Sequence, residues 1–365
     1  MKKNNKLLIV TPTYLPSYDT GGPVFQIKKL TENLQIRKIT FKVICSTNSL
    51  ALINRKDANT IYIKTYFGRL YLSFALLIYL IKNINKYNVV YIVSCYNFFS
   101  LFSSYICRLK KIDYFISPRG SLMSKSIMIK NTFIKKLWIF FFERKFILSA
   151  RKIIFSSQYE KTETIKILKI KNYIIIKNFI LNDKIKKIKK EKYLLYLGRI
   201  DKKKNIDIII HAIKKTNNLF LKIIGNGKES YLRYLKGIVT ENNLENRVSF
   251  IKADYTKNKN QIFGKASISF LISKVENFGN TILESIINYT PVIISPYTGL
   301  SQDIKKNNFG FICNDNINSL SSLLKKIDSK KIKIPVIRKN KLRKFINNYK
   351  TKFIFNKYIN LFKFI

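Results

Sequence analysis

The sequence predicts an α/β protein with two Rossmann-like domains in tandem, each built on a parallel sheet. Short apolar, β-branched runs alternate with longer amphipathic stretches, which is typical of parallel strands covered by helices. The alternation is interrupted by the charged stretch 182–192 and then resumes. The length of 365 residues suits two ordinary domains, and 47% hydrophobic residues supply enough apolar material for their cores.

The first series of elements starts with a strand, a loop and a helix over Pro23–Leu34, whose proline stands in a tolerated first-turn position. A second helix is predicted over Asn131–Leu148. The strands predicted for this series are Leu7–Thr11, Phe41–Ser46, Val89–Ser94, Tyr114–Ser117, Lys152–Phe155 and Tyr173–Ile176.

The second series begins after the charged stretch and is equally regular. Its predicted strands are Tyr193–Leu197, Phe220–Ile224, Val248–Ile251, Ile268–Ile272 and Val292–Ser295, and its predicted helices are Ile206–Lys215, Glu229–Thr240 and Asn280–Ile287. Ligands of such sheets bind at the carboxyl ends of the strands, so we expect the functional site in a cleft between the domains.

These two series give the predicted domain boundaries: an N-terminal domain over 1–178, a linker over 179–192 and a C-terminal domain over 193–335. Residues 336–365 form a basic amphipathic stretch. We predict that it is a helix that packs back on the N-terminal domain, and contact with a membrane surface is the alternative.

The net charge of +49 is the most unusual property of the composition. The surplus is divided almost evenly between the two halves of the chain, so it is not a basic tail. Compositional drift explains it as well as attraction to phosphate-rich partners does, such as nucleotides, lipid diphosphates or an anionic membrane surface. A nucleic-acid partner is not predicted, because no localised basic stripe or known module stands out.

The cysteines and the apolar runs bear on the compartment. The four cysteines lie far apart without a CxxC spacing, which indicates a reducing compartment and no disulfide or zinc framework. The apolar run Leu7–Val10 is too short for a secretory signal, and Tyr71–Ile81 is too short for a membrane span. We therefore expect a cytoplasmic protein, with peripheral attachment to the inner face of the membrane as an open alternative.

Two carboxylates eight positions apart, Glu276 and Glu284, carry the strongest functional signal, in the stretch SKVENFGNTILES. Glu276 falls in the loop before a predicted helix, and Glu284 falls in the second turn of that helix. The helix opens at Gly279, and an exposed helix N-terminus suits a sugar diphosphate. A carboxylate accepts two hydrogen bonds, so each could hold a vicinal diol of a sugar or a ribose.

Two further loops follow strands at the expected ligand edge. In LGRIDKKKN, Arg199 and Lys204 keep their positive charge at neutral pH and could bind phosphate. In TPTYLPSYDTGGP, Gly21 and Gly22 permit close approach of a phosphate or sugar to the backbone. The second loop matches neither a dinucleotide nor a Walker fingerprint.

With these residues in place, the chain resembles the family-4 retaining glycosyltransferases of the GT-B fold, the "glycosyl transferases group 1". The likeness runs from Leu7 to about Asp315. It is carried in order by Gly21–Gly22, by SPRGSL at Ser117–Leu122, by Asn178, by Gly198–Asn205, by Gly225–Gly227, by Glu276 and Glu284, by Pro291–Ile293 and by Thr298–Gly299. The fold that the resemblance implies has two parallel sheets that face each other across a cleft.

The resemblance also implies roles for individual residues. Arg199 and Lys204 would hold the diphosphate of a UDP- or GDP-sugar, and Glu284 would bind its ribose. Glu276 would hold the transferred sugar, together with the backbone of Asn277, Phe278, Gly279 and Asn280. Glu276, Arg199 and Lys204 are expected to be the catalytic residues. Gly225 is expected to line the donor site, and the Gly21–Gly22 loop would close over the donor from the acceptor domain.

The sequence departs from its relatives at one position. Many relatives carry a histidine near the segment that matches SPRGSL, and here that segment has Arg119, which we assign to donor or acceptor contact. The only histidine, His211, is read as structural. The resemblance implies a retaining transfer to a glycan or lipid-diphosphate acceptor in surface polysaccharide synthesis, such as lipopolysaccharide or capsule, without metal or cofactor and without a protein general base.

Two other classes of function stay in view. A non-catalytic polyanion or nucleic-acid binder would account for the charge of +49 but not for the two carboxylates. Another GT-B enzyme would be an epimerase, which the Glu276–Glu284 spacing disfavours, or a phosphorylase, for which the chain is too short.

Overall fold

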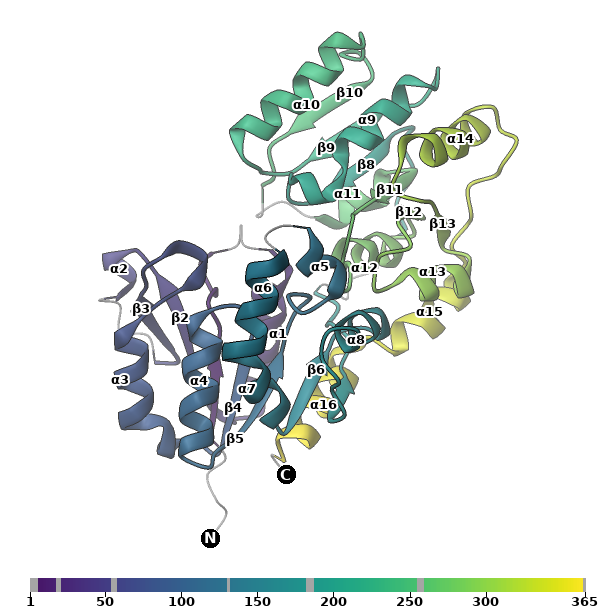
Figure 1. Cartoon of the computed structure of the whole chain (residues 1–365). Helices are drawn as coiled ribbons and strands as arrows, with labels where there is room; N and C mark the ends of the chain where they lie inside the picture. Colours follow the sequence, from purple (N-terminus) through teal and green to yellow (C-terminus); the bar gives the residue numbers. More distant parts are fainter. Residues whose placement is uncertain are drawn as a thin grey trace. The chain divides into compact units, whose positions relative to one another are not determined.

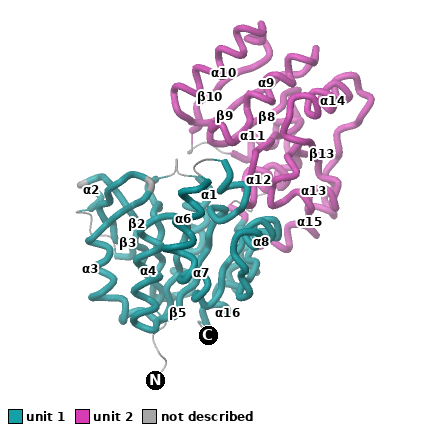
Figure 2. Tube along the Cα trace, in the orientation of Figure 1, with its two compact units in different colours: residues 1–179, 351–365 teal, residues 180–350 magenta. Residues whose placement is uncertain are grey.

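The computed structural model describes residues 6–17, 21–53, 58–129, 132–181, 187–254 and 259–363. The chain forms two compact units, shown in different colours in Figure 2. Unit 1 consists of Met1–Phe179 and Thr351–Ile365, and unit 2 of Ile180–Lys350. Each unit has its own parallel sheet covered by helices, which confirms the predicted α/β fold with two Rossmann-like domains (Figure 1).

The sheet of unit 1 has the strand order β3-β2-β1-β4-β5-β6-β7, with parallel pairing throughout. Its strands are β1 (Lys6–Val10), β2 (Thr40–Thr47), β3 (Thr60–Lys64), β4 (Val89–Val93), β5 (Asp113–Ser117), β6 (Lys152–Phe155) and β7 (Tyr173–Ile175). Strand β3 was not predicted, because its alternating pattern is short and follows a polar stretch. Ile9 of the central strand β1 pairs with Val43 of β2 and with Tyr91 of β4.

Helices cover both faces of this sheet. They are α1 (Gly22–Ile36), α2 (Leu50–Ile53), α3 (Phe74–Asn83), α4 (Phe98–Leu109), α5 (Ser124–Met128), α6 (Thr132–Trp138), the π-helical turn η4 (Ile139–Glu143), α7 (Arg144–Ser149), α8 (Gln158–Ile165) and α16 (Thr351–Phe362), with 3₁₀ turns η2 (Gly68–Leu70) and η3 (Ile84–Lys86). The helix predicted over 131–148 is thus interrupted by a π-helical turn, and Asn131 lies outside the described residues.

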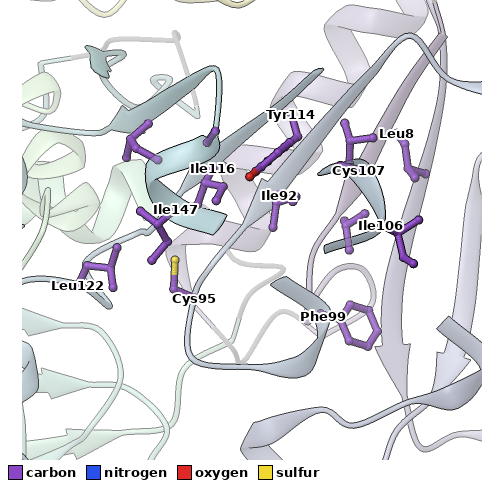
Figure 3. Packing of buried hydrophobic residues seen from close by; sticks show 14 of the residues in the cluster. Leu8, Ile92, Cys95, Phe99, Ile106, Cys107, Tyr114, Ile116, Leu122 and Ile147 are labelled. Atoms are coloured by element: carbon purple, nitrogen blue, oxygen red, sulfur yellow. The ribbon is translucent and has the colours of Figure 1, made fainter. Parts of the chain in front are cut away.

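Alternate residues of the strands fill two separate cores, as the period of two in a strand requires. Leu8 and Ile92 face a core that includes Phe99 of α4 and Ile147 of α7 (Figure 3). Leu7, Ile9 and Tyr91 face the opposite core, which is closed by α1 and by the last helix, α16.

Helix α16 returns the end of the chain to unit 1. Tyr358 stacks on Phe179 and contacts Tyr91, and Phe362 packs against Tyr91 and Phe115. The apolar side of α16 is therefore occupied by protein core. The preceding helix, α15 (Lys339–Asn347), belongs to unit 2, so the predicted single segment 336–365 is divided between the two units.

The sheet of unit 2 has the order β10-β9-β8-β11-β12-β13, again with parallel pairs. Its strands are β8 (Leu194–Leu197), β9 (Leu221–Ile224), β10 (Val248–Ile251), β11 (Ile268–Leu271), β12 (Val292–Ile294) and β13 (Gly310–Ile312). The strand order reverses at β8, which lies between β9 and β11. Such a reversal opens a crevice at the carboxyl ends of the strands, where ligands bind.

The helices of unit 2 include the three predicted over 206–215, 229–240 and 280–287, and others that were not predicted. They are η5 (Lys202–Lys204, 3₁₀), α9 (Ile206–Lys214), α10 (Glu229–Glu241), α11 (Lys259–Lys265), α12 (Asn280–Ile287), α13 (Ser301–Asn307), α14 (Ile317–Asp328) and α15. The predicted linker is only partly described, since residues 182–186 lie outside the described part. Ile180 packs into the core of unit 2 with Leu271 and Phe278.

Three glutamates of unit 1, Glu143, Glu160 and Glu163, are buried and hydrogen-bonded. Glu160 of α8 accepts hydrogen bonds from the Gly120 and Ser156 N–H groups, and Glu163 accepts one from Ser124. Their carboxylates therefore fix the loop that follows β5. In η4, Oε1 of Glu143 accepts the Tyr96 N–H at 2.7 Å and the Ser100 hydroxyl at 3.1 Å.

The burial of Glu143 predicts a pH dependence of stability. Burial raises the pKa of this carboxyl from 4.5 to about 7, although its hydrogen bonds oppose the shift. The folded state therefore holds the proton more tightly than the unfolded state, and this group's contribution to stability falls as the pH rises from 4.5 to about 7. Glu143→Gln should remove that loss, which amounts to at most about 3 kcal/mol.

Urea denaturation on both sides of this pH window measures the effect. The free energy of unfolding of Glu143→Gln relative to the wild type should increase with pH. Glu32→Gln, at a partly exposed position of α1, is the matched control and should leave the pH profile of the wild type unchanged. Parallel pH profiles for Glu143→Gln and the wild type would contradict the assigned burial cost.

Candidate functional site

The residues with the strongest signal in the sequence gather at the carboxyl edge of the unit 2 sheet. The loops after β8 and β11 lie side by side, because these two strands are paired neighbours. The backbone N–H of Lys274 donates to the carbonyl of Lys203 at 2.9 Å and joins the two loops. Two distant stretches of sequence thus form one local surface.

Glycines allow the loops after β8 and β9 to touch through their backbones. A Cβ at Gly225 would overlap the carbonyl oxygen of Gly198, and one at Gly227 would overlap that of Ile200. Ile200 and Gly227 form a parallel bridge in which the Ile200 N–H donates to the carbonyl of Asn226. Gly225 therefore shapes this part of the site by allowing close packing, while its predicted contact with a ligand stays a prediction.

Lys204 and Glu276 form an ion pair across the two loops, with Nζ 2.5 Å from Oε2. Their side chains are only 17% and 19% exposed. The turn that presents Lys204 is fixed by Asp201, whose side chain accepts the Lys203 N–H at 3.0 Å. Asn205 ends this turn in the left-handed region with φ 50°, a conformation that asparagine tolerates better than most residues.

Glu276 is held by the loop after β12. Its N–H donates to the carbonyl of Tyr297 at 2.9 Å, and its own carbonyl accepts the N–H of Gly299 at 3.0 Å. With both backbone groups bonded, the backbone that carries this carboxylate is fixed before any ligand arrives. Such preorganisation lowers the cost of binding.

Helix α12 begins directly after Glu276. Gly279 precedes it with φ 94°, a left-handed conformation that favours glycine. Phe278 is buried in the core and anchors this turn. No side chain caps the helix, so its first turn presents the positive end of the helix dipole. Asn277 and Asn280 flank that turn and are half-buried.

Glu284 lies in the second turn of α12, with a side chain that is 14% exposed. Its Oε2 is buried and forms no hydrogen bond with any described residue, and Nζ of Lys259 lies 4.0 Å from it. Burial raises the pKa of this carboxyl, and the nearby lysine opposes the shift. A largely buried carboxylate oxygen without a hydrogen-bond donor is costly, and a ligand hydroxyl would satisfy it.

Arg199 lies on the same loop as Lys204 and is exposed. Its carbonyl accepts a hydrogen bond from the buried Tyr196 hydroxyl at 2.6 Å, which fixes the backbone below the guanidinium. Within the described part of the chain, the guanidinium itself forms no hydrogen bond or ion pair. It thus differs from Lys204, whose charge is already neutralised by Glu276.

The candidate residues of unit 1 have different surroundings. Arg119 donates to Asn178 Oδ1 at 2.8 Å, to the Tyr91 hydroxyl at 3.1 Å and to the Tyr358 hydroxyl at 3.5 Å. These bonds tie the loop after β5 to α16, and the proposed contact of Arg119 with a donor or acceptor stays a prediction.

Gly21 has φ 105° and precedes α1, which starts at Gly22. The remaining loop residues 18–20 lie outside the described part. The left-handed φ explains the need for glycine at position 21, and the predicted closure of this loop over a donor stays a prediction.

Two features, Lys259 beside the candidate site and the buried Glu160 of unit 1, were not foreseen. Lys259, the partner of Glu284, gave no signal because lysine is so common in this chain. Glu160 could have been found from the capping pattern S-x-x-E at Ser157–Glu160, in which the Ser157 hydroxyl accepts the Glu160 N–H. Among the described residues, no cluster of three or more His, Cys, Asp or Glu could hold a metal ion.

Comparison with known proteins finds a family of glycosyltransferases whose model matches unit 2. Residues 178–353 match the model of the family described as "Glycosyl transferases group 1". This range includes the Lys204–Glu276 pair, Arg199 and Glu284.

Two curated relatives match parts of the chain. The poly(ribitol-phosphate) alpha-N-acetylglucosaminyltransferase of Staphylococcus aureus is 25% identical over 230 residues, which are 60% of this chain and 46% of that protein. The N-acetylgalactosamine-N,N'-diacetylbacillosaminyl-diphospho-undecaprenol 4-alpha-N-acetylgalactosaminyltransferase of Campylobacter jejuni is 30% identical over 164 residues, 44% of this chain and 41% of that one. The chain therefore matches less than half the length of either relative.

Solved structures match over nearly the whole chain. Anabaena HepE, in a crystal structure with UDP and glucose, has a TM-score of 0.75 at 14% identity and covers 99% of this chain and 100% of its own. At this identity the match shows a shared fold, the GT-B fold of two Rossmann-like domains.

Proposed function

Since residues 178–353 match the model of the group 1 glycosyltransferase family, we propose that the chain transfers a sugar from a nucleoside diphosphate sugar to a hydroxyl of an acceptor. The observation that carries this proposal is the Lys204–Glu276 pair beside the start of α12 and the unsatisfied carboxylate of Glu284. Positive charge for a diphosphate and carboxylates for two sets of hydroxyls occur together on one sheet edge.

Binding of the donor would give both Lys204 and Glu276 a new partner. In this structure Lys204 and Glu276 neutralise each other. A bound diphosphate would take the ammonium of Lys204, and hydroxyls of the sugar would take the carboxylate of Glu276 together with the backbone of Asn277–Asn280. Arg199, whose guanidinium is exposed, would be a second cation for the diphosphate.

Charge stabilisation is the chemical task of this arrangement. When the bond from the sugar to the diphosphate breaks, negative charge grows on the leaving phosphate. Lys204, Arg199 and the first turn of α12 would stabilise that charge through fixed positive groups. We propose retention of the anomeric configuration, with attack by the acceptor hydroxyl on the face that the phosphate leaves and with the phosphate as proton acceptor. Neither glutamate is then assigned as a general base.

Glu284 would bind the ribose of the nucleotide. Its Oε2 forms no hydrogen bond within the described chain, and a vicinal diol offers two donors to one carboxylate. UDP is the first nucleotide to test, because HepE was crystallised with UDP and glucose, and GDP is the second. The thermal-unfolding screen described below decides between UDP and GDP.

The acceptor is proposed to be a glycan or a lipid-diphosphate-linked glycan in the assembly of a surface polysaccharide. The name of the Staphylococcus relative specifies a poly(ribitol-phosphate) acceptor, and that of the Campylobacter relative a diphospho-undecaprenol acceptor. The net charge of +49 suits such phosphate-bearing acceptors. A cytoplasmic location is part of the same proposal, because nucleotide sugars would be the donors.

A thermal-unfolding screen against UDP, GDP, ADP, CMP and their common sugars tests the proposal. A ligand at a hundred times its dissociation constant stabilises the folded state by about 2.7 kcal/mol, so one nucleoside diphosphate should raise the Tm clearly. A rise in Tm with DNA or RNA, without any rise with nucleotides, would replace the transferase by the polyanion binder. Release of nucleotide from the selected sugar donor then measures catalysis without knowledge of the acceptor.

A further inference from the structure

The outward side of one helical segment in unit 1 is apolar. Helices α6, η4 and α7 form a continuous segment over 132–149, which we call the outer arm. Its residues Phe133, Phe140 and Phe141 are 73%, 60% and 69% exposed, and α6 buries none of its side chains. Further exposed apolar residues in or next to the arm are Met128, Ile134, Leu137, Phe142 and Leu148.

The apolar surface continues over the neighbouring helices α4 and α3. The three segments lie side by side on one face of the sheet, with α4 between the outer arm and α3 (Figure 1). Phe74, Ile78 and Ile81 of α3 are exposed at helical spacing, and Tyr105 and Leu109 of α4 are exposed as well. A surface of this kind on a folded domain marks a site of interaction, since single exposed apolar residues are normal but a contiguous group is not.

The same surface carries positive charge with little negative charge. Asp113 and Glu143 are the only acids of the sequence between residues 58 and 150. Glu143 is buried, and Asp113 is paired with Arg151. Exposed basic residues border the apolar side chains: Lys82, Lys86, Arg108, Lys110, Lys111, Lys136, Arg144 and Lys145.

We propose that the outer arm docks unit 1 onto an anionic phospholipid surface. Its phenylalanines would enter the boundary between head groups and acyl chains, and the basic residues around them would contact lipid phosphates. Basic amphipathic helices with exposed aromatic and aliphatic side chains bind membranes in this way, through buried apolar area and attraction to anionic lipid together.

The charge and the apolar side chains of this surface favour an anionic membrane over a second copy of the chain and over a nucleic acid. A second copy of the chain would bring the same basic surface to the contact, and the two would repel each other. A nucleic acid would match the charge but would leave aliphatic residues such as Ile134 and Leu148 uncovered. An anionic bilayer satisfies both parts of the surface. No helix in the described ranges has the length and apolarity to cross a bilayer, so the contact would lie in the plane of the interface.

The arm is fixed to the loop that follows β4. Glu143 accepts the Tyr96 N–H, and Trp138 packs edge to face on Phe98 with ring centroids 5.3 Å apart. The carboxyl end of β4 belongs to the sheet edge where ligands of such folds bind. Docking would thus hold this edge in a fixed orientation relative to the membrane. The consequence for a lipid-linked acceptor rests on the proposed function, while the docking itself does not.

Trp138 provides a direct test, because it is the only tryptophan of the chain and lies in the outer arm. The full-length protein is mixed with phosphatidylglycerol–phosphatidylcholine vesicles whose acyl chains carry bromine, which quenches tryptophan at contact distance. We expect quenching that saturates with lipid and weakens in high salt. Phosphatidylcholine alone should quench little, because the electrostatic attraction is then absent.

Substitutions locate the contact. Phe133→Ser/Phe140→Ser/Phe141→Ser should lower the vesicle partition coefficient by at least about tenfold, and Lys136→Glu/Arg144→Glu should lower it to a similar degree. The matched control is Phe220→Ser/Ile251→Ser/Val336→Ser, three exposed apolar positions of unit 2, and its partitioning should change by less than about twofold. Vesicle sedimentation measures all of these variants.

Other outcomes would overturn the proposal. Vesicle binding without bromine quenching, or with equal loss in the control triple, would place the contact elsewhere. A dimer in sedimentation velocity without lipid, abolished by the phenylalanine triple, would assign the surface to a second copy. DNA binding that is lost in the same triple would assign it to nucleic acid. The rise in Tm with nucleotide should persist in the phenylalanine triple, so failure of docking and failure of the proposed transferase are separable.

Discussion

Replacement of Lys204 by methionine is expected to lower kcat/KM for release of the nucleotide from its sugar donor by about 10²–10³-fold. Methionine keeps most of the length of the side chain and removes only its charge. The reason for the size of the effect is that Lys204 is fixed, little exposed and 2.5 Å from Glu276, so no water or neighbouring lysine can replace its ammonium at the same point. Steady-state release of the nucleotide measures the loss.

Lys202→Met is the matched control, because Lys202 belongs to the same 3₁₀ turn but is exposed. It should retain kcat/KM within about twofold, since exposed charges contribute little at a distance in water. A loss as large in Lys202→Met as in Lys204→Met would show that the charge of the whole loop matters and not the position of Lys204.

Stability has to be separated from catalysis in this test. Lys204→Met leaves the carboxylate of Glu276 without its ion-pair partner at 19% exposure, which should destabilise the protein by about 1–3 kcal/mol. The double variant Lys204→Met/Glu276→Gln removes both charges and should recover most of that stability. It should not recover activity. Recovery of activity in the double variant would mean that the pair is only structural.

Replacement of Glu284 by glutamine is expected to remove the rise in Tm that the best nucleotide gives to the wild type. The ribose diol would lose two hydrogen bonds to a charged acceptor, at a cost of about 3 kcal/mol or about 100-fold in Kd. At the nucleotide concentration of the screen, the ligand-dependent stabilisation would then nearly vanish. Isothermal titration of the same nucleotide gives the change in Kd directly.

The unliganded Glu284→Gln variant should be at least as stable as the wild type near neutral pH. Burial raises the pKa of Glu284, so the ionised carboxyl is destabilising in the empty protein, and a neutral amide of the same size relieves that cost. If Glu284 served in packing alone, Glu284→Gln would lower the stability and leave ligand binding unchanged. Glu229→Gln, at an exposed position in the first turn of α10, is the control and should alter neither property.

The two substitutions probe different parts of one ligand. Lys204 should act on kcat through the charge that develops on the leaving phosphate, whereas Glu284 should act on nucleotide affinity in the ground state. If Glu284→Gln lowers kcat with unchanged nucleotide Kd, the assignment of the ribose to Glu284 fails while the Lys204 assignment stands. The wild-type screen for nucleotides precedes both tests.

The sequence predicted the fold well because the fold is recorded in local patterns. Buried parallel strands read as short β-branched runs, and the helices between them have one apolar face. Strands β3 and β13 were missed. The five residues Thr60–Lys64 of β3 alternate weakly and follow a polar stretch, and β13 has only the three residues Gly310–Ile312. The outer arm was predicted as one helix, and neither its π-helical turn at Ile139–Glu143 nor its exposed phenylalanines could be foreseen. Apolar residues on a helix are normally assigned to the core.

The sequence by itself determined the alternation of strands and helices, the presence of two Rossmann-like units and the two carboxylates of the ENFG stretch. The tertiary structure alone decided which of these residues meet. The pairing of β8 with β11 brings Lys204 to Glu276 across 72 positions of sequence, and the return of α16 places Tyr358 beside Arg119. The physical reason is that helix and strand periods are set by neighbours in sequence, whereas burial, ion pairs and exposed faces depend on strand order and packing partners, which no local pattern records.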